Sequence, residues 1–144
     1  MTHPAIDGMD QQDGADFSAR DVKTLFGGTK SQISMELSGA YPLKMCKKYY
    51  TREVFFDKID NRVLLTDTTD AENVILNFIT YEKPEMAGNR IMVGTLAEAA
   101  FSGAELLSVE ILPITDARPR IAWDHELYRI HLAMTAAEFK LEIK

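Results

Sequence analysis

The sequence predicts a mainly β fold, at the margin of α+β: an antiparallel sandwich or barrel of about seven to eight strands with two short helices. Two observations lead to this prediction. Several short segments alternate apolar and polar residues with a period of two, which is typical of half-buried strands. The segments follow one another through short connections, which favours antiparallel pairing over a parallel sheet with crossover helices.

Length and composition indicate one globular unit. The chain has 144 residues, which fits a single domain that can bury its own core. Its hydrophobic fraction is 46% and its charged fraction is 26%, which argues against general disorder. We expect a single strand-rich domain over residues 17–144, preceded by an acidic N-terminal arm over residues 1–16.

The arm stands out by its composition. It has four aspartates and no lysine or arginine, so it carries −4 of the net charge of −6. Such a segment buries too little apolar surface to order itself. We therefore expect a neighbouring subunit to hold the arm, with its aspartates as partner-binding residues: Asp7, Asp10, Asp13 and Asp16.

The first part of the domain predicts a helix, a strand and a hairpin. Residues 18–26 predict a short helix, because Ser18 is a suitable cap and two glycines follow the segment. Residues 32–38 alternate cleanly and predict a strand. Residues 53–66 predict a hairpin around Asp60-Asn61, since both residues tolerate positive φ.

The middle of the chain contains one ambiguous segment. Residues 70–83 begin with a capping box that favours a helix, but their β-branched content and alternation favour a strand, which we prefer. Residues 90–94 predict a short strand. Thr95 and Glu98 then form a second capping box, which predicts an alanine-rich helix that ends near Gly103.

The C-terminal part predicts three more strands. Residues 105–114 predict a strand that ends at Pro113, and a turn follows around residues 117–119. Residues 127–134 and 139–143 alternate apolar with polar side chains and predict the last two strands.

The charge balance excludes some classes of partner. The net charge of −6 and a pI of about 5.0 disfavour binding to nucleic acid and to anionic membranes. Cys46 is the single cysteine, so no intrachain disulfide can form, which suits a reducing compartment. The sequence shows neither a long apolar span nor a signal peptide. We therefore expect a cytoplasmic protein with no membrane partner and no specific nucleic-acid partner.

No motif predicts a catalytic residue, a metal site or a cofactor. The glycines before Lys30 resemble a phosphate loop, but that motif needs a Gly directly before its Lys, and Thr29 stands there. His125 and His131 are six residues apart, too far along a strand to share one metal ion. Cys46 lacks a recognisable nucleophile motif.

One segment is basic in an otherwise acidic chain. Residues 44–52 contain Lys44, Lys47, Lys48 and Arg52, interleaved with Tyr49 and Tyr50. Three interpretations stay open for this segment: a solvated loop with packed tyrosines, a contact with an acidic surface of another subunit, or stacking on nucleic-acid bases. Trp123 is a further candidate, as a core anchor or an interface anchor.

These features favour a non-enzymatic structural protein that packs on copies of itself or on a partner in a homo-oligomer or larger assembly. Small strand-rich domains with arms also build phage tail tubes, necks and capsid decorations, so a virion component, made in the host cytoplasm, is the expected role. Two alternatives stay open. One is a β-barrel module that binds a small apolar ligand, and the other is an enzyme of unfamiliar type that uses His125 or His131.

Overall fold

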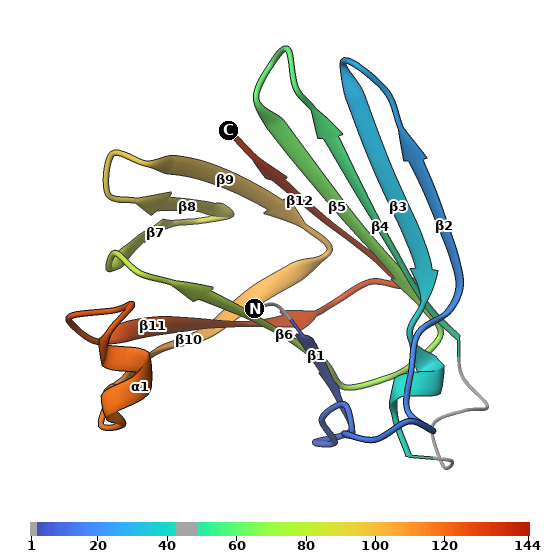
Figure 1. Cartoon of the computed structure of the whole chain (residues 1–144), viewed down its shortest axis with the longest axis horizontal. Coiled ribbons are helices and arrows are strands. Elements are labelled where there is room, and N and C mark those ends of the chain that lie inside the picture. The colour runs from blue at the N-terminus through green and yellow to red at the C-terminus, as the bar shows by residue number, and fades with distance from the viewer. Residues whose placement is uncertain (1–2, 43–48) are drawn as a thin grey trace.

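The fold is a pair of antiparallel sheets in an open, sandwich-like arrangement (Figure 1). The computed structural model describes residues 3–42 and 49–144. These residues form twelve strands, a one-turn α-helix and a short 3-10 helix. The prediction of a mainly β, antiparallel fold is confirmed. No helix within the described ranges is long and apolar enough to cross a membrane.

The two sheets differ in size. The larger has the order β2-β3-β4-β5-β12-β9-β8-β7, and the smaller has the order β1-β6-β11-β10. The strands of the larger sheet are β2 (Arg20–Phe26), β3 (Lys30–Glu36), β4 (Tyr50–Asp57), β5 (Arg62–Thr69), β12 (Glu138–Ile143), β9 (Ala97–Ser102), β8 (Arg90–Val93) and β7 (Pro84–Ala87). Those of the smaller sheet are β1 (His3–Ile6), β6 (Val74–Thr80), β11 (Leu127–Met134) and β10 (Ala104–Leu112). The helices are η1 (Ser38–Ala40) and α1 (Ala117–Arg120).

The hydrophobic core lies between the sheets. Leu76 and Ile130 of the smaller sheet are almost fully buried, as are Phe139 and Leu141 of the larger sheet. The rings of Phe78 and Phe139 lie 5.9 Å apart between centroids, so they join β6 to β12 across the sandwich. Burial of these alternating side chains is what fixes the register of the central strands.

Several predicted elements are confirmed. The hairpin predicted over residues 53–66 is β4 and β5, and Asn61 in its turn has a φ of 47°. The ambiguous segment 70–83 contains a strand, β6, as preferred. The remaining predicted strands correspond to β3, β8, β10, β11 and β12.

The helix predicted over residues 18–26 is wrong. This segment forms β2, which pairs antiparallel with β3. The two glycines lie at the hairpin tip, where the Gly27 N–H donates to the Lys30 carbonyl at 2.8 Å. A nine-residue helix is marginal in water, whereas pairing along β3 satisfies the backbone of the segment.

The helix predicted after Thr95 is also wrong. The alanine-rich segment is β9, which lies between β8 and β12. Glu98 exchanges two backbone hydrogen bonds with Lys144, at 3.0 and 2.9 Å. Its small side chains suit a position facing the smaller sheet, and this packing overrides the helix propensity of alanine.

The arm is partly held by its own chain. β1 pairs antiparallel with β6, and Ile6 is buried in the core. The Tyr41 hydroxyl donates to the Pro4 carbonyl at 2.6 Å, and the Gln12 N–H donates to the Ala40 carbonyl at 2.9 Å. The expectation that a neighbouring subunit must order the arm is therefore wrong for residues 3–6, because strand pairing supplies the order.

Candidate functional site

The larger sheet extends beyond the smaller one. At about 4.8 Å per strand, eight strands span about twice the width of four. Figure 1 shows β2, β3, β4 and β5 fanning away from the smaller sheet, with two hairpin tips projecting at the top. The inner face of these strands is therefore only partly covered within the molecule.

A row of mostly apolar side chains crosses this inner face. Register partners share a face of a sheet, so the pairings from β2 to β7 define one row of eight side chains. We call it the tip row. Ile91 and Ala99 are buried at one end, whereas Phe26 at the other end is 76% exposed. In strand order its members are Phe26, Ser31, Phe56, Val63, Ile143, Ala99, Ile91 and Met86.

The row ends at an exposed edge strand. In the described part of the chain, β2 has a neighbouring strand on one side only, and all seven of its residues are exposed. Val22 is 53% exposed and Leu25 is 67% exposed, in addition to Phe26. An edge strand with large apolar side chains is a template for pairing with another chain.

A second exposed edge belongs to the smaller sheet. β10 pairs with β11, and every residue from Glu105 to Ile111 is exposed. Leu107 and Ile111 are 51% and 59% exposed. Trp123 lies in the connection from β10 to β11 and is 42% exposed, so its indole contributes to the surface rather than to a sealed core.

An apolar cleft lies where the sheets diverge. Its volume is about 330 Å³, which falls in the range of small-ligand sites. Residues of both sheets line it, and nearly all are apolar: Phe78, Ile79, Thr80, Ile91, Val93, Ala97, Ala99, Ile130, Leu141 and Ile143. The cleft therefore offers a second surface for an apolar occupant.

Two residues predicted to face a partner are instead inside the protein. Tyr50 is fully buried and Arg52 is 8% exposed. Arg52 Nε and Nη2 donate to Asp67 Oδ1 and Oδ2 at 2.7 and 2.6 Å, and the Tyr50 hydroxyl donates to Asp67 Oδ2 at 2.8 Å. The interpretation as partner-binding residues is therefore wrong for Tyr50 and Arg52, because both occupy inward positions of β4 and do not extend a basic surface.

The pKa values in this buried network follow from its contacts. Burial raises the pKa of Tyr50 well above its usual range, and the Asp67 carboxylate raises it further. Burial opposes the charged form of Arg52, but its hydrogen bonds to Asp67 outweigh this and raise its pKa. The network therefore consists of a neutral tyrosine that is hydrogen-bonded to a buried ion pair, which suits a structural role.

The structure describes only some of the other predicted partner-binding residues. Lys44, Lys47 and Lys48 lie outside the described residues. Tyr49 is 45% exposed, and its N–H donates to Asp70 Oδ1 at 2.9 Å. The four arm aspartates are exposed, and Asp7 Oδ1 accepts from Asn73 Nδ2 at 2.8 Å. A contact between the arm and residues 44–52 of another subunit stays a prediction.

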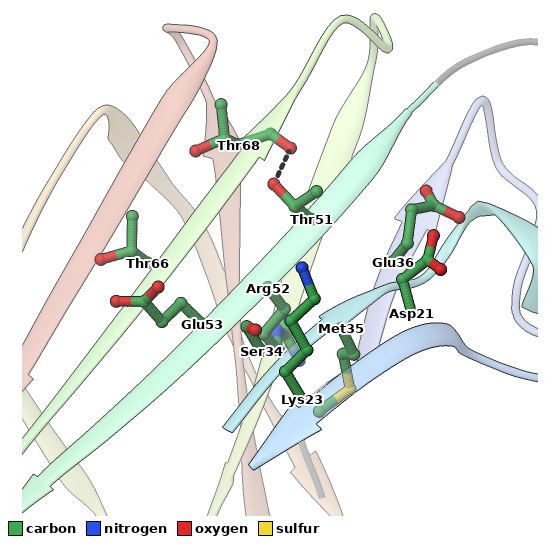
Figure 2. Close-up of a pocket in the computed structure, with 10 residues that line it drawn as sticks. All are labelled: Asp21, Lys23, Ser34, Met35, Glu36, Thr51, Arg52, Glu53, Thr66 and Thr68. Atoms are coloured by element: carbon green, nitrogen blue, oxygen red, sulfur yellow. Dashed lines mark hydrogen bonds between the residues drawn. The ribbon is translucent and has the colours of Figure 1, made fainter. Parts of the chain in front are cut away.

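A shallow cavity with a mostly polar lining lies on the outer face of β2 to β5 (Figure 2). Its volume is about 310 Å³. Carboxylates of Asp21 and Glu36 lie at one side, and the hydroxyls of Thr51, Thr66 and Thr68 at the other. Glu36 accepts from the N–H groups of Ser38 and Tyr50, so it is engaged in the fold rather than available as a base.

Neither histidine lies in a closed site. His125 Nδ1 is 2.9 Å from Asp124 Oδ1, but the side chain of Asp124 is 83% exposed. The ring of Tyr81 lies against that of His125, and its hydroxyl donates to Asp124. His131 Nε2 is 3.3 Å from Glu110 Oε2 on β10. An enzyme that uses either histidine stays a prediction.

Comparisons with known proteins add no family. No protein-family model matches the chain, and no curated protein matches its sequence. Among residues 3–42 and 49–144, no group of three or more His, Cys, Asp or Glu side chains is arranged to hold a metal ion.

Proposed function

We propose that this protein is a non-enzymatic assembly subunit that packs on copies of itself through β2 and the tip row beside it. The observation that carries the proposal is the exposure of every residue of β2, three of them large and apolar. Soluble proteins usually protect such edges with short strands, charges or a covering segment. A second copy that pairs with β2 would cover this edge and bring its own side chains against Phe26, the exposed end of the tip row.

The size of the apolar surface supports a contact that includes both features. Complete burial of Val22, Leu25 and Phe26 would contribute about 1.5–3 kcal/mol for each side chain. Association costs about 4–15 kcal/mol in lost freedom of motion. The three side chains alone are therefore comparable with that cost, and we expect the partner to cover Phe56 and Val63 of the tip row as well.

The finer role as a virion component rests on analogy. A small strand-rich domain with an arm is the general build of phage tail-tube, neck and capsid decoration subunits. The net charge of −6 also suits a conduit through which DNA must pass without sticking. Assembly in a host cytoplasm followed by incorporation into a virion stays a prediction.

Mutation of the edge tests the proposal. We expect the variant with Leu25→Glu and Phe26→Glu to have the mass of one chain by light scattering after size exclusion, while the wild type has a larger mass. Leu96→Glu is the matched control, because Leu96 is 73% exposed in the β8–β9 turn, away from β2. An unchanged oligomer in the double variant would contradict the proposal.

The cleft favours a second candidate function, the binding of a small apolar ligand. Ala99 lines the cleft and is 8% exposed, so Ala99→Trp would fill it. We expect the wild type to bind a long-chain fatty acid, and Ala99→Trp to bind it at least about tenfold more weakly in a fluorescence displacement assay. Ala87→Trp on β7 is the control, since Ala87 is exposed and does not line the cleft. Equal binding by all three proteins would exclude the cleft as the site.

A further inference from the structure

The strand edges of the two sheets fall into two classes. Among the described strands, the outermost ones are β2 and β7 in the larger sheet and β1 and β10 in the smaller. β1 and β7 have four residues each, whereas β2 has seven and β10 has nine. The two long edges are also the two that present large exposed apolar side chains, Leu25 and Phe26 on one and Leu107 and Ile111 on the other.

The charges on the two long edges are opposite. β2 carries Arg20 and Lys23 with Asp21, whereas β10 carries Glu105 and Glu110 and no basic residue. Arg129 Nη1 lies 3.4 Å from Glu110 Oε2, so part of the charge of Glu110 is compensated within its own sheet. The remaining excess still favours contact between β2 and β10 over contact of either strand with its own copy.

The two edges lie apart on the molecule. Figure 1 places β2 at the right-hand end and β10 along the lower left, in the other sheet. They cannot therefore pair within one chain as it is folded. A contact between β2 of one copy and β10 of the next leaves one unused β2 and one unused β10 in every dimer, so it propagates into a ring or a filament.

We infer that β2 of one copy pairs with β10 of a second copy, so that subunits join head to tail and the larger sheet of one continues into the smaller sheet of the next. This inference rests on the proposed self-assembly and names the surface that β2 meets. β10 would bring its exposed Leu107, Val109 and Ile111 to the apolar side chains of β2. Trp123, in the connection that follows β10, would lie at the rim of the same contact.

Backbone geometry supplies a specific way to block the pairing. At the hairpin tip the Gly27 N–H donates to the Lys30 carbonyl, so these two residues occupy a hydrogen-bonded pair position of the ladder. Such pairs alternate along an antiparallel ladder, so Leu25 and Gln32 also form one, whereas the N–H of Thr24 points away from β3. Thr24→Pro therefore removes a hydrogen-bond donor from the outer edge of β2 and leaves its pairing with β3 intact.

Mixing two blocked variants tests the inference. The β2-blocked variant carries Leu25→Glu and Phe26→Glu, and the β10-blocked variant carries Val109→Lys and Ile111→Lys. We expect each variant alone to have the mass of one chain by light scattering. An equimolar mixture is expected to double that mass, because one intact β2 then meets one intact β10. Circular dichroism checks whether each variant is folded. Where a variant is not folded, a milder substitution on the same strand replaces it: Thr24→Pro on β2 or Leu107→Lys on β10.

The other outcomes separate the two proposals. If the wild type associates but the mixture keeps the mass of one chain, the β2–β10 contact is wrong while self-assembly stands. If the β10-blocked variant associates by itself, β2 pairs with β2, and the head-to-tail contact is again overturned. A wild type with the mass of one chain at every concentration would overturn both proposals.

Discussion

Arg52 is the residue whose position differs most from its predicted one. Its positive charge placed it in a basic surface segment, yet it is paired with Asp67 in the interior. Side chains two residues apart on a strand point to the same face, so Arg52 shares the inward face of Val54. The alternation of β4 therefore indicates an inward Arg52, whereas the charge of this side chain alone indicates a surface position.

The buried ion pair between Arg52 and Asp67 should contribute to the stability of the fold. Asp67→Asn leaves the Arg52 guanidinium buried without a full counter-charge, so we expect it to lower the free energy of unfolding by about 3–5 kcal/mol. Urea denaturation of the folded protein measures this change. Asp60→Asn, in the exposed β4–β5 turn, is the matched control and should change stability by less than about 0.5 kcal/mol.

A double replacement separates charge from packing at the same site. With Arg52→Met and Asp67→Leu together, no buried charge is left unpaired, and we expect most of the lost stability to return. If Asp67→Asn were as stable as the wild type, the ion pair would not hold this part of the sandwich together.

Gly103 shows how an element can be misjudged from its local sequence. It was predicted to stop a helix, but it is the corner at which the chain leaves β9 in the larger sheet and enters β10 in the smaller. Its φ is +77°, and a Cβ on it would lie 2.0 Å from the Glu138 carbonyl oxygen. Both the conformation and the close approach require glycine.

The corner gives a prediction at the scale of elements. A positive φ alone costs an alanine about 1 kcal/mol. We expect Gly103→Ala to lower the free energy of unfolding by clearly more than this, because the new methyl group meets the backbone of β12. Gly88→Ala is the control: its φ is +61°, but a Cβ there meets nothing within 4 Å. Thermal melting compares the two variants. Equal melting temperatures would show that the close approach relaxes without cost.

The sequence predicted the strands better than the helices for a physical reason. Alternation in β6, β11 and β12 reflects burial on one face, so it survives in the fold. Capping boxes and alanine content are local preferences, and in β9 the pairing with distant strands overrides them. In β2 a local preference of the same kind hid the edge strand, since residues 18–26 were predicted to form a capped helix.

At the scale of the whole molecule, the mismatch between the sheets is the central feature. Four strands cannot cover eight, so the tip row passes from the core to an exposed edge. No single segment of sequence contains this property, because it depends on how the strands are divided between the sheets. The sequence led to the hypothesis of self-association through the arm and residues 44–52, and it did not identify β2 or β10.

The arm also changes how assembly should be tested. Deleting residues 1–16 would remove β1, bury less of the core and leave the Tyr41 hydroxyl without its acceptor on Pro4. A loss of association after that deletion would therefore report on folding as much as on contact between subunits. The β2 substitutions lie on an exposed strand and avoid this difficulty.

The most direct test of the account is the mass of the unmodified wild-type protein, measured by light scattering at increasing concentration. We expect a mass that rises from one chain toward a larger assembly as β2 becomes covered. A mass of one chain that stays constant up to the highest soluble concentration would contradict it.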